Sequence, residues 1–177
     1  MRIFIAIQLD NHIKSHLNCM TKELMPYFSN ARFTHPENYH ITLKFIGEIG
    51  RDNFNKTIKA IKTVASEIGK FMIWTKGVGN FTKRNKHIFY CSTKDSVDLH
   101  NLNSVIDKEL KNVGVIFNDG KFTPHITLAR EVVLSDRYPE IEFEEKGIEV
   151  EAISVMESTR VNGKLTYIPQ FTAKLKG

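Results

Sequence analysis

The sequence is poor in cysteine and has no long apolar run. Its 177 residues include two cysteines, Cys19 and Cys91, and neither has a second metal-ligating residue at a useful spacing. This pattern disfavours a disulfide framework and a zinc site, and we expect two buried free thiols. The segment MRIFIAIQLD reaches Asp10 after one short apolar stretch, which predicts neither a signal peptide nor a membrane span. We therefore expect a cytoplasmic protein without membrane association.

The sequence also lacks a glycine-rich phosphate loop, a serine-hydrolase nucleophile elbow and a pair of carboxylates suited to catalysis. We therefore expect an active site that needs neither a cofactor nor a metal ion. A hydrophobic content of 41% and a charged content of 25% are typical of a soluble globular protein. The net charge of +5 suits a polyanionic ligand without requiring one.

The tetrapeptide His-Ile-Thr-Leu occurs twice, at His40–Leu43 and at His125–Leu128, and both copies lie in short apolar runs typical of strands. Side chains alternate between the two faces of a strand, so His40 shares a face with Thr42, and His125 shares one with Thr127. A single histidine at such a position is more often a satisfied polar residue at a strand end. Two facing pairs, however, would supply an acid, a base and hydroxyls able to hold a phosphate.

A cationic residue follows each copy of the motif. Lys44 should share the face of His40, and Arg130 comes just after the second copy. Either cation could neutralise charge that develops on a phosphate. Strict alternation places Arg130 on the face opposite to His125 unless the strand twists or bulges there. The same alternation predicts that Phe45 lies on the apolar face of its strand.

The order of elements predicts an α+β fold with helices on the outer faces of antiparallel sheets. The two motifs lie 85 residues apart, about half the chain, which suggests two similar lobes within one domain of residues 1–177. Asn162-Gly163 is a strong hairpin signal. The expected strands are Arg2–Leu9, Ala31–Thr34, His40–Gly47, Phe71–Val78, His87–Ser92, His125–Arg130, Ile148–Arg160 and Lys164–Lys174.

Three helices are expected between these strands, each with one apolar stripe facing the core. The first begins with Asp10 or Asn11 as its N-cap and ends before Pro26, the second runs from about Asp52 to Gly69, and the third from about Ser96 to Gly114. The expected stripes are Ile13, Leu17, Met20 and Leu24 in the first helix, Phe54, Ile58, Ile61, Ala65 and Ile68 in the second, and Leu99, Leu102, Ile106 and Val113 in the third.

These features resemble the 2H phosphoesterase superfamily, and within it the bacterial and archaeal RNA 2′,3′-cyclic phosphodiesterases, also called 2′-5′ RNA ligases. The resemblance extends over nearly the whole chain. It is carried by the opening RIFIAIQLDNHIK, the first motif PENYHITLKFIGEI, the second motif FTPHITLAR and the closing hairpin with Met156-Glu157-Ser158, Gly163 and Tyr167. The segment from Gly77 through Phe81 resembles the loop on the substrate side of the family's site.

The resemblance implies a bilobal fold in which two antiparallel sheets are related by a pseudo-twofold axis, with the motifs facing across a central groove. It implies hydrolysis of an RNA 2′,3′-cyclic phosphate, with weak reversible 2′-5′ ligation. His40 would be the proton donor and His125 the proton acceptor. Thr42, Thr127 and Arg130 would bind the phosphate. The expected partner is an RNA end, such as that of a tRNA fragment, and the expected state is a monomer.

Two other functions stay open. A related phosphodiesterase could act on 2′-5′ oligoadenylates or small cyclic nucleotides, and a non-catalytic RNA-binding module could retain the groove. The basic segment Lys83–His87 departs from the family, whose members often carry more proline there, and is either a solvated loop or a contact for an RNA backbone. Intact His and Thr in both motifs favour catalysis.

Overall fold

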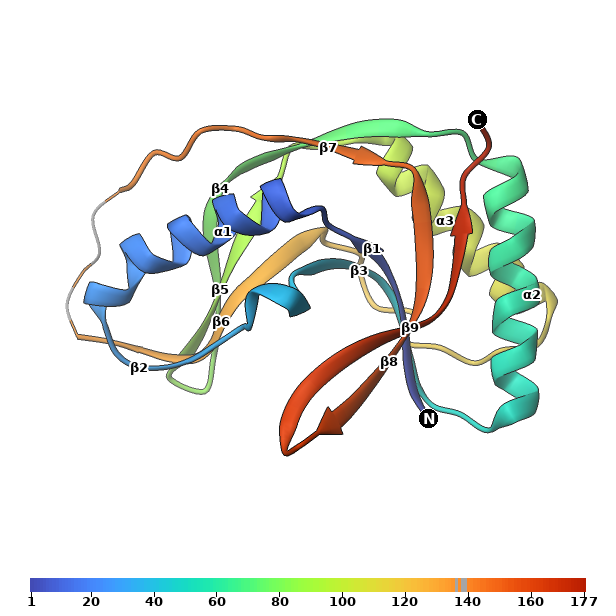
Figure 1. The fold of residues 1–177 in the computed structure, drawn as a ribbon, viewed down its shortest axis with the longest axis horizontal. Helices are drawn as coiled ribbons and strands as arrows, with labels where there is room; N and C mark the ends of the chain where they lie inside the picture. The colour runs from blue at the N-terminus through green and yellow to red at the C-terminus, as the bar shows by residue number, and fades with distance from the viewer. Residues whose placement is uncertain (136, 138–139) are drawn as a thin grey trace.

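The computed structural model describes residues 1–135, 137 and 140–177. These residues form nine strands and three α-helices (Figure 1). The strands are β1 (Arg2–Gln8), β2 (Phe28–Phe33), β3 (His40–Glu48), β4 (Phe71–Lys83), β5 (Lys86–Thr93), β6 (His125–Leu134), β7 (Gly147–Val150), β8 (Ala152–Val161) and β9 (Lys164–Lys174). The helices are α1 (Asn11–Leu24), α2 (Arg51–Glu67) and α3 (Val97–Asn112), with short 3-10 turns η1 (Met25–Tyr27) and η2 (Pro36–Asn38).

The strands form two antiparallel sheets, as the α+β prediction requires. The first sheet has the order β3-β1-β8-β9, and the second has the order β2-β6-β5-β4-β7. Helices α2 and α3 pack against the first sheet and α1 against the second (Figure 1). The two motif strands, β3 and β6, contact each other where the sheets meet. The fold thus brings together two segments that lie far apart in the sequence.

The core confirms the predicted inner faces of both motif strands. Ile41 and Leu43 of β3 and Ile126 and Leu128 of β6 are buried in one hydrophobic cluster that draws on both sheets and all three helices. A smaller cluster of Phe4, Ala6 and Met156 lies beside Tyr167. The rings of Phe4 and Tyr167 both contact the motif histidine His40.

The predicted helix starts are confirmed where a side chain caps the first turn. Asp10 accepts a hydrogen bond from the amide of Ile13 at 2.8 Å, and Ser96 accepts one from the amide of Leu99 at 3.2 Å. Helix α2 begins one residue earlier than expected, after Gly50, without a side-chain cap. All four residues of the predicted stripe in α1 are buried.

The stripes of the other two helices are only partly as expected. Helix α2 buries Thr57, Ala60, Ile61, Val64 and Ala65, because it packs against α3 as well as against β8 and β9 and therefore turns a second side inward. Phe54 and Ile68 are only partly buried. In α3, Leu110 takes the buried place expected for Val113.

The cysteine prediction is half wrong. Cys91 is a buried free thiol as expected, but Cys19 is exposed. The stripe that α1 buries runs through Leu17 and Met20, and Cys19 lies off it, turned towards solvent.

The larger differences from the predicted strands are four, one of which is that β6 continues past Arg130 to Leu134. Strand β2 begins at Phe28, β4 continues to Lys83, and the segment expected as one strand from Ile148 divides into β7 and β8 at Glu151. The Asn162-Gly163 turn is confirmed. Both residues have positive φ, 51° and 77°, as the tight turn between β8 and β9 requires.

Candidate active site

Both motif histidines are held by the same backbone contact. Nδ1 of His40 lies 2.7 Å from the carbonyl oxygen of Asn38, and Nδ1 of His125 lies 2.7 Å from that of Thr123. A carbonyl only accepts hydrogen bonds, so each Nδ1 carries a proton and donates. This leaves Nε2 as the nitrogen available for proton transfer in both rings. In the first motif Nε2 of His40 lies 2.9 Å from the hydroxyl of Thr42, which confirms that the two share a face.

A β-bulge lies at the same point of each motif. Along the β1–β3 ladder Thr42 and then Lys44 have partners and Leu43 is skipped, and along β5–β6 Thr127 and then Ala129 have partners and Leu128 is skipped. A bulge inserts one residue and so reverses the faces of the residues that follow. The leucine of each motif is accordingly followed by a second buried residue.

The bulge in β6 turns Arg130 towards the motif histidines. Its Nη2 lies 3.4 Å from the hydroxyl of Thr127, a long hydrogen bond to the motif itself. Its positive charge also lowers the pKa of both His40 and His125, which shows that it lies near the two rings at once. The bulge that the sequence argument required for Arg130 is therefore present.

The bulge in β3 has the opposite consequence for Lys44, and the expectation that Lys44 shares the face of His40 is wrong. Its side chain is 4% exposed and its Nζ lies 2.7 Å from Oδ1 of Asp107 on α3. One turn earlier on the same helix, Asn103 donates to the carbonyl of the bulged Leu43 at 2.6 Å. The amine of Lys44 is thus already paired with a carboxylate of α3, although Lys44 also lines the hollow that Thr42 and His125 share. Its predicted role as a phosphate ligand stays a prediction.

Phe45 takes the place in β3 that Arg130 takes in β6. It was expected on the apolar face, but it is 53% exposed and its ring lies 6.2 Å from that of Phe4. The two motifs are therefore alike up to the bulge and chemically different after it. One side of the site receives an aromatic ring and the other a permanent cation.

Four aromatic rings surround the two imidazoles, two for each. Phe4 and Tyr167 lie 5.0 and 5.1 Å from the ring of His40, centroid to centroid. Tyr90 and Phe81 lie 5.3 and 5.4 Å from that of His125. They come from β1, β9, β5 and β4. Phe4, Phe81 and Tyr167 lie within the segments that resemble the family, but no role was predicted for their rings, and Tyr90 was not predicted at all. Aromatic residues at alternate positions of strands next to the motif strands would have been the signal.

Gly79 allows one of these rings to take its place. A Cβ atom at residue 79 would lie 2.5 Å from the ring of Tyr90, so any larger residue would push the ring away. Tyr90 stacks on Phe81 with centroids 4.4 Å apart, and both rings meet the edge or face of His125. Substitution of Gly79 would therefore disturb the surroundings of His125.

Burial sets the protonation of both histidines. It lowers the pKa of His40 to about 4, helped by the charges of Arg130 and His125 and opposed by the hydrogen bond to Asn38. Burial also lowers the pKa of His125, helped by Arg130 and opposed by the hydrogen bond to Thr123. At neutral pH both rings are therefore neutral in the free protein. Either can accept a proton, but neither holds one to give until an anion arrives.

A hollow of about 240 Å³ joins the two motifs. Thr42 of the first motif and His125 of the second both line it, together with Lys44, Phe45 and Phe122. Two further hollows meet at Arg130, of about 490 and 580 Å³. Arg130 thus stands at a junction from which a bound molecule could extend. Within the described residues, no group of three or more His, Cys, Asp or Glu could hold a metal ion.

Comparison with known proteins agrees with this geometry. Residues 7–90 match the family described as LigT-like phosphoesterase. An RNA 2′,3′-cyclic phosphodiesterase of Archaeoglobus fulgidus is 30% identical over 131 residues, which cover 73% of this chain and 72% of that protein. The chain belongs to the LigT-like phosphoesterase family.

Other relatives extend over more of this LigT-like phosphoesterase. The RNA 2′,3′-cyclic phosphodiesterase of Thermotoga maritima is 26% identical over 164 residues, covering 90% of this chain and 87% of that one. The fold of Escherichia coli LigT, solved in complex with 3′-AMP, superposes with a TM-score of 0.81 over 99% of this chain and 98% of that one, at 20% identity. None of the helices in the described ranges has the length and apolar character needed to span a bilayer.

Proposed function

We propose that this LigT-like phosphoesterase hydrolyses the 2′,3′-cyclic phosphate at an RNA end to a 2′-phosphomonoester. The observation that carries the proposal is the meeting of the motifs: Thr42 and His125 line one hollow, and Arg130 acts on both imidazoles. The names of the A. fulgidus and T. maritima relatives, both RNA 2′,3′-cyclic phosphodiesterases, support this choice of substrate.

In the proposed reaction, Nε2 of His125 takes a proton from a water molecule whose oxygen attacks phosphorus. The bond between phosphorus and the 3′-oxygen breaks, and protonated Nε2 of His40 gives its proton to that oxygen. The products are a 2′-phosphate and a free 3′-hydroxyl. Proton transfer by positioned side chains on both sides of phosphorus is general acid–base catalysis. The contacts to Asn38 and Thr123 keep each Nε2 oriented for it.

The phosphate would be held by the groups beside the imidazoles. The hydroxyls of Thr42 and Thr127 can each donate to a non-bridging oxygen, and the guanidinium of Arg130 offers several N–H donors and a fixed charge. Arg130 already contacts Thr127, so the two can bind the same oxygen or adjacent ones. These hydroxyl and guanidinium donors are already in position, so they can stabilise the negative charge that develops on the phosphate oxygens in the transition state.

The pKa of His40 is about 4 in the free protein, so at neutral pH this ring carries no proton on Nε2 to donate. Its proposed role as the acid therefore requires that substrate binding raise this pKa. A bound phosphate brings a negative charge next to the ring, and an opposite charge raises the pKa of a histidine. The Asn38 carbonyl also favours the charged ring, since it accepts from Nδ1. We therefore propose that His40 becomes an acid only when the substrate is bound.

A titration by nuclear magnetic resonance tests this step. With ¹⁵N-labelled protein, His40 should be neutral between about pH 5 and 7 when free and protonated there when adenosine 2′-monophosphate is bound. The bound anion should raise its pKa, so the change is towards protonation. The ring of His100 on α3, which pairs with Asp95 just before that helix, serves as the internal control. A His40 ring that stays neutral in the complex would remove it as proton donor.

Chelation should leave the activity unchanged. Because two imidazoles perform both proton transfers and Arg130 supplies the positive charge, turnover of an RNA ending in a 2′,3′-cyclic phosphate should be the same with and without excess EDTA. Inactivation by EDTA that a divalent metal ion reverses would contradict the acid–base scheme.

The same assay tests the substrate. RNA ending in a 2′,3′-cyclic phosphate, a 2′-5′ oligoadenylate and a small cyclic nucleotide should be offered separately. We expect the first to be turned over best, to a 2′-phosphate that chromatography distinguishes from the 3′ isomer.

By microscopic reversibility the same groups could join ends in weak 2′-5′ ligation. Both motifs lie in one chain, so we propose that a monomer suffices, and we place it in the cytoplasm.

A further inference from the structure

The hollow of about 490 Å³ beside Arg130 is built from three separate parts of the chain. They are β2 with the turn that follows it, Arg130 of β6, and the hairpin formed by β8 and β9. Its lining includes Arg32, Phe33, Arg160, Lys164 and Tyr167. Tyr167 also touches the ring of His40, so the hollow continues directly from the phosphodiester site.

Positive charge dominates this hollow. Four of its lining residues are cationic, namely Arg32, Arg130, Arg160 and Lys164. Its one carboxylate, Glu37, pairs with Nζ of Lys14 at 3.0 Å, and Arg32 pairs with Glu131 outside the hollow at 3.3 Å. Arg160 donates from Nη1 to the carbonyl of Gly163 at 2.8 Å, which fixes the guanidinium at the hairpin and leaves other N–H groups available.

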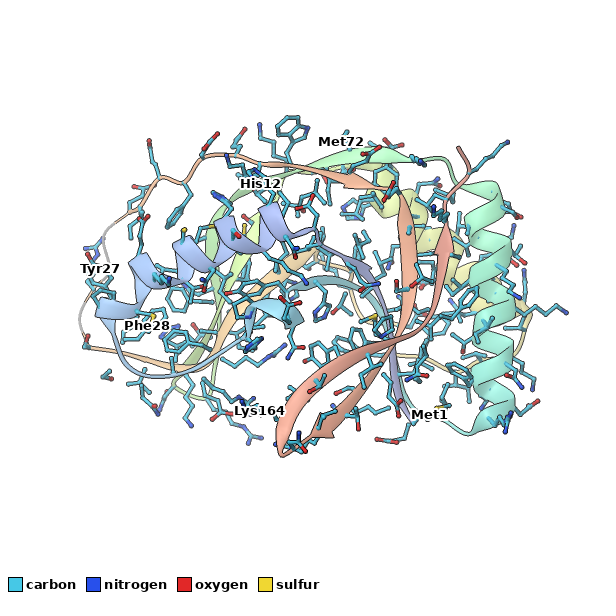
Figure 2. The ribbon with its side chains drawn as sticks, viewed as in Figure 1. Met1, His12, Tyr27, Phe28, Met72 and Lys164 are labelled. Carbon is cyan, nitrogen blue, oxygen red and sulfur yellow. The ribbon has the colours of Figure 1, made fainter. Side chains whose placement is uncertain are left out.

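Asn38 holds the hairpin against the catalytic turn. Its side chain donates to the carbonyl of Leu165 at 2.9 Å and accepts from the amide of Tyr167 at 3.3 Å, as a neighbouring strand would. Its own carbonyl accepts from Nδ1 of His40. One residue therefore joins the wall of the hollow to the catalytic imidazole. Figure 2 shows the hairpin projecting from the body of the molecule, with Lys164 at its tip.

The hollow also offers aromatic surface. Phe33 is 38% exposed and lines the hollow together with the four cations and Tyr167, and its ring stacks on that of Phe28 with centroids 6.1 Å apart. Aromatic faces stack on bases, and cationic grooves follow the nucleic-acid backbone. A volume of about 490 Å³ is within the range of small-molecule sites and suits one nucleotide.

The chemistry of the substrate indicates which nucleotide of an RNA end could bind in this hollow. In a 2′,3′-cyclic phosphate end, both ribose hydroxyls of the last nucleoside are esterified to the same phosphorus. The chain can continue only through the 5′-oxygen, so the next phosphate lies on that side. We propose that this hollow binds the nucleotide on the 5′ side of the cyclic phosphate, its phosphate at Arg160 and Lys164 and its base against Phe33. This assignment rests on the proposed function.

The neighbouring hollow of about 580 Å³ fits this role less well. It is lined by Arg84 and Lys86 of the β4–β5 hairpin, within the segment that the sequence analysis left open as loop or RNA contact. Its lining also includes the carboxylate of Glu131, which lies 3.9 Å from Nζ of Lys86 and 3.3 Å from Nη2 of Arg32. Its lining residues also include no Phe, Tyr or Trp on which a base could stack.

The test compares two substrates that differ by one nucleotide. Adenosine 2′,3′-cyclic phosphate has only the scissile phosphate, whereas ApA ending in a 2′,3′-cyclic phosphate adds one 5′ nucleotide. Arg160→Gln/Lys164→Gln should lower kcat/KM on the dinucleotide by roughly 10-fold and alter that on the mononucleotide little. Lys59→Gln/Lys108→Gln removes the same charge from exposed positions on α2 and α3 and should change neither.

Other outcomes would overturn the assignment. An equal loss on both substrates, no loss on either, or the same selective loss from Arg84→Gln/Lys86→Gln alone would each place the nucleotide elsewhere. If the wild type hydrolyses neither substrate, the proposed function is wrong. A binding measurement then tests whether the hollow binds a nucleotide. Calorimetry with ApA ending in a 2′-phosphate should show roughly 10-fold weaker binding to the Arg160→Gln/Lys164→Gln variant. Equal binding would contradict the proposal.

Discussion

Replacing His40 or His125 by alanine should lower turnover of an RNA 2′,3′-cyclic phosphate by roughly 10²- to 10⁴-fold, the usual contribution of a general acid or base. Both rings are half-buried beside aromatic side chains, and neither belongs to the main hydrophobic cluster. The variants should therefore stay folded. Thr42→Val and Thr127→Val should cost less, because each removes one hydroxyl and keeps a strand-forming residue.

The controls separate chemistry from folding. His100→Ala changes a histidine on α3 that contacts Phe122 and Asp95, and it should keep wild-type turnover. His40→Gln restores much of the lost volume without an acid–base group, so it should be as inactive as His40→Ala. Circular dichroism and the urea midpoint should match the wild type in each case. Near wild-type turnover by either motif variant would remove that histidine from the mechanism.

The fold could be predicted largely from local patterns. Helix caps such as Asp10 and Ser96 and the Asn162-Gly163 turn depend on neighbouring residues, so a sequence shows them directly. Strand ends were less certain, because β4 continues to Lys83 only through its pairing with β5. Such pairing is a tertiary effect that a local pattern does not contain.

In the candidate site, too, local patterns could be predicted from the sequence and tertiary contacts could not. His40 and Thr42 share a face as the repeated motif predicts, but the side chains after each motif depend on a bulge that alternation does not foresee. The bulges turn Arg130 towards Thr127 and bury Lys44, which pairs with Asp107 on α3. The rings of Phe4 and Tyr90 come from strands next to the motif strands, so their contacts with the imidazoles appear only once the sheets are formed.

The two motifs differ in the residue that follows the bulge, so the site is chemically asymmetric. After the bulge one motif carries Phe45 and the other Arg130, so the positive charge is supplied from the side of His125. That charge lowers the pKa of His125, which keeps the ring neutral and able to act as a base. The anion bound by Arg130 would restore the pKa of His40, the acid. Arg130 thus lowers the pKa of both imidazoles in the free protein, and the difference between them would arise from the anion that it binds.

Replacing Arg130 by glutamine should therefore have two effects. It should lower kcat/KM by roughly 10²- to 10³-fold, as expected for loss of a principal donor to the transition state. It should also raise the pKa of His125, because a positive charge that disfavours its protonation is gone. In the complex His125 must be neutral to act as the base, so the acid limb of the pH profile of kcat should move to higher pH.

Two further variants make this prediction specific. Arg130→Lys keeps the charge and loses the forked donor, so it should keep the acid limb near its wild-type position while recovering only part of the rate. Arg51→Gln removes an arginine from the exposed start of α2 and should change neither rate nor profile. An Arg130→Gln variant with the wild-type acid limb would show that the guanidinium does not act on the base. One with the wild-type rate as well would exclude Arg130 from the site.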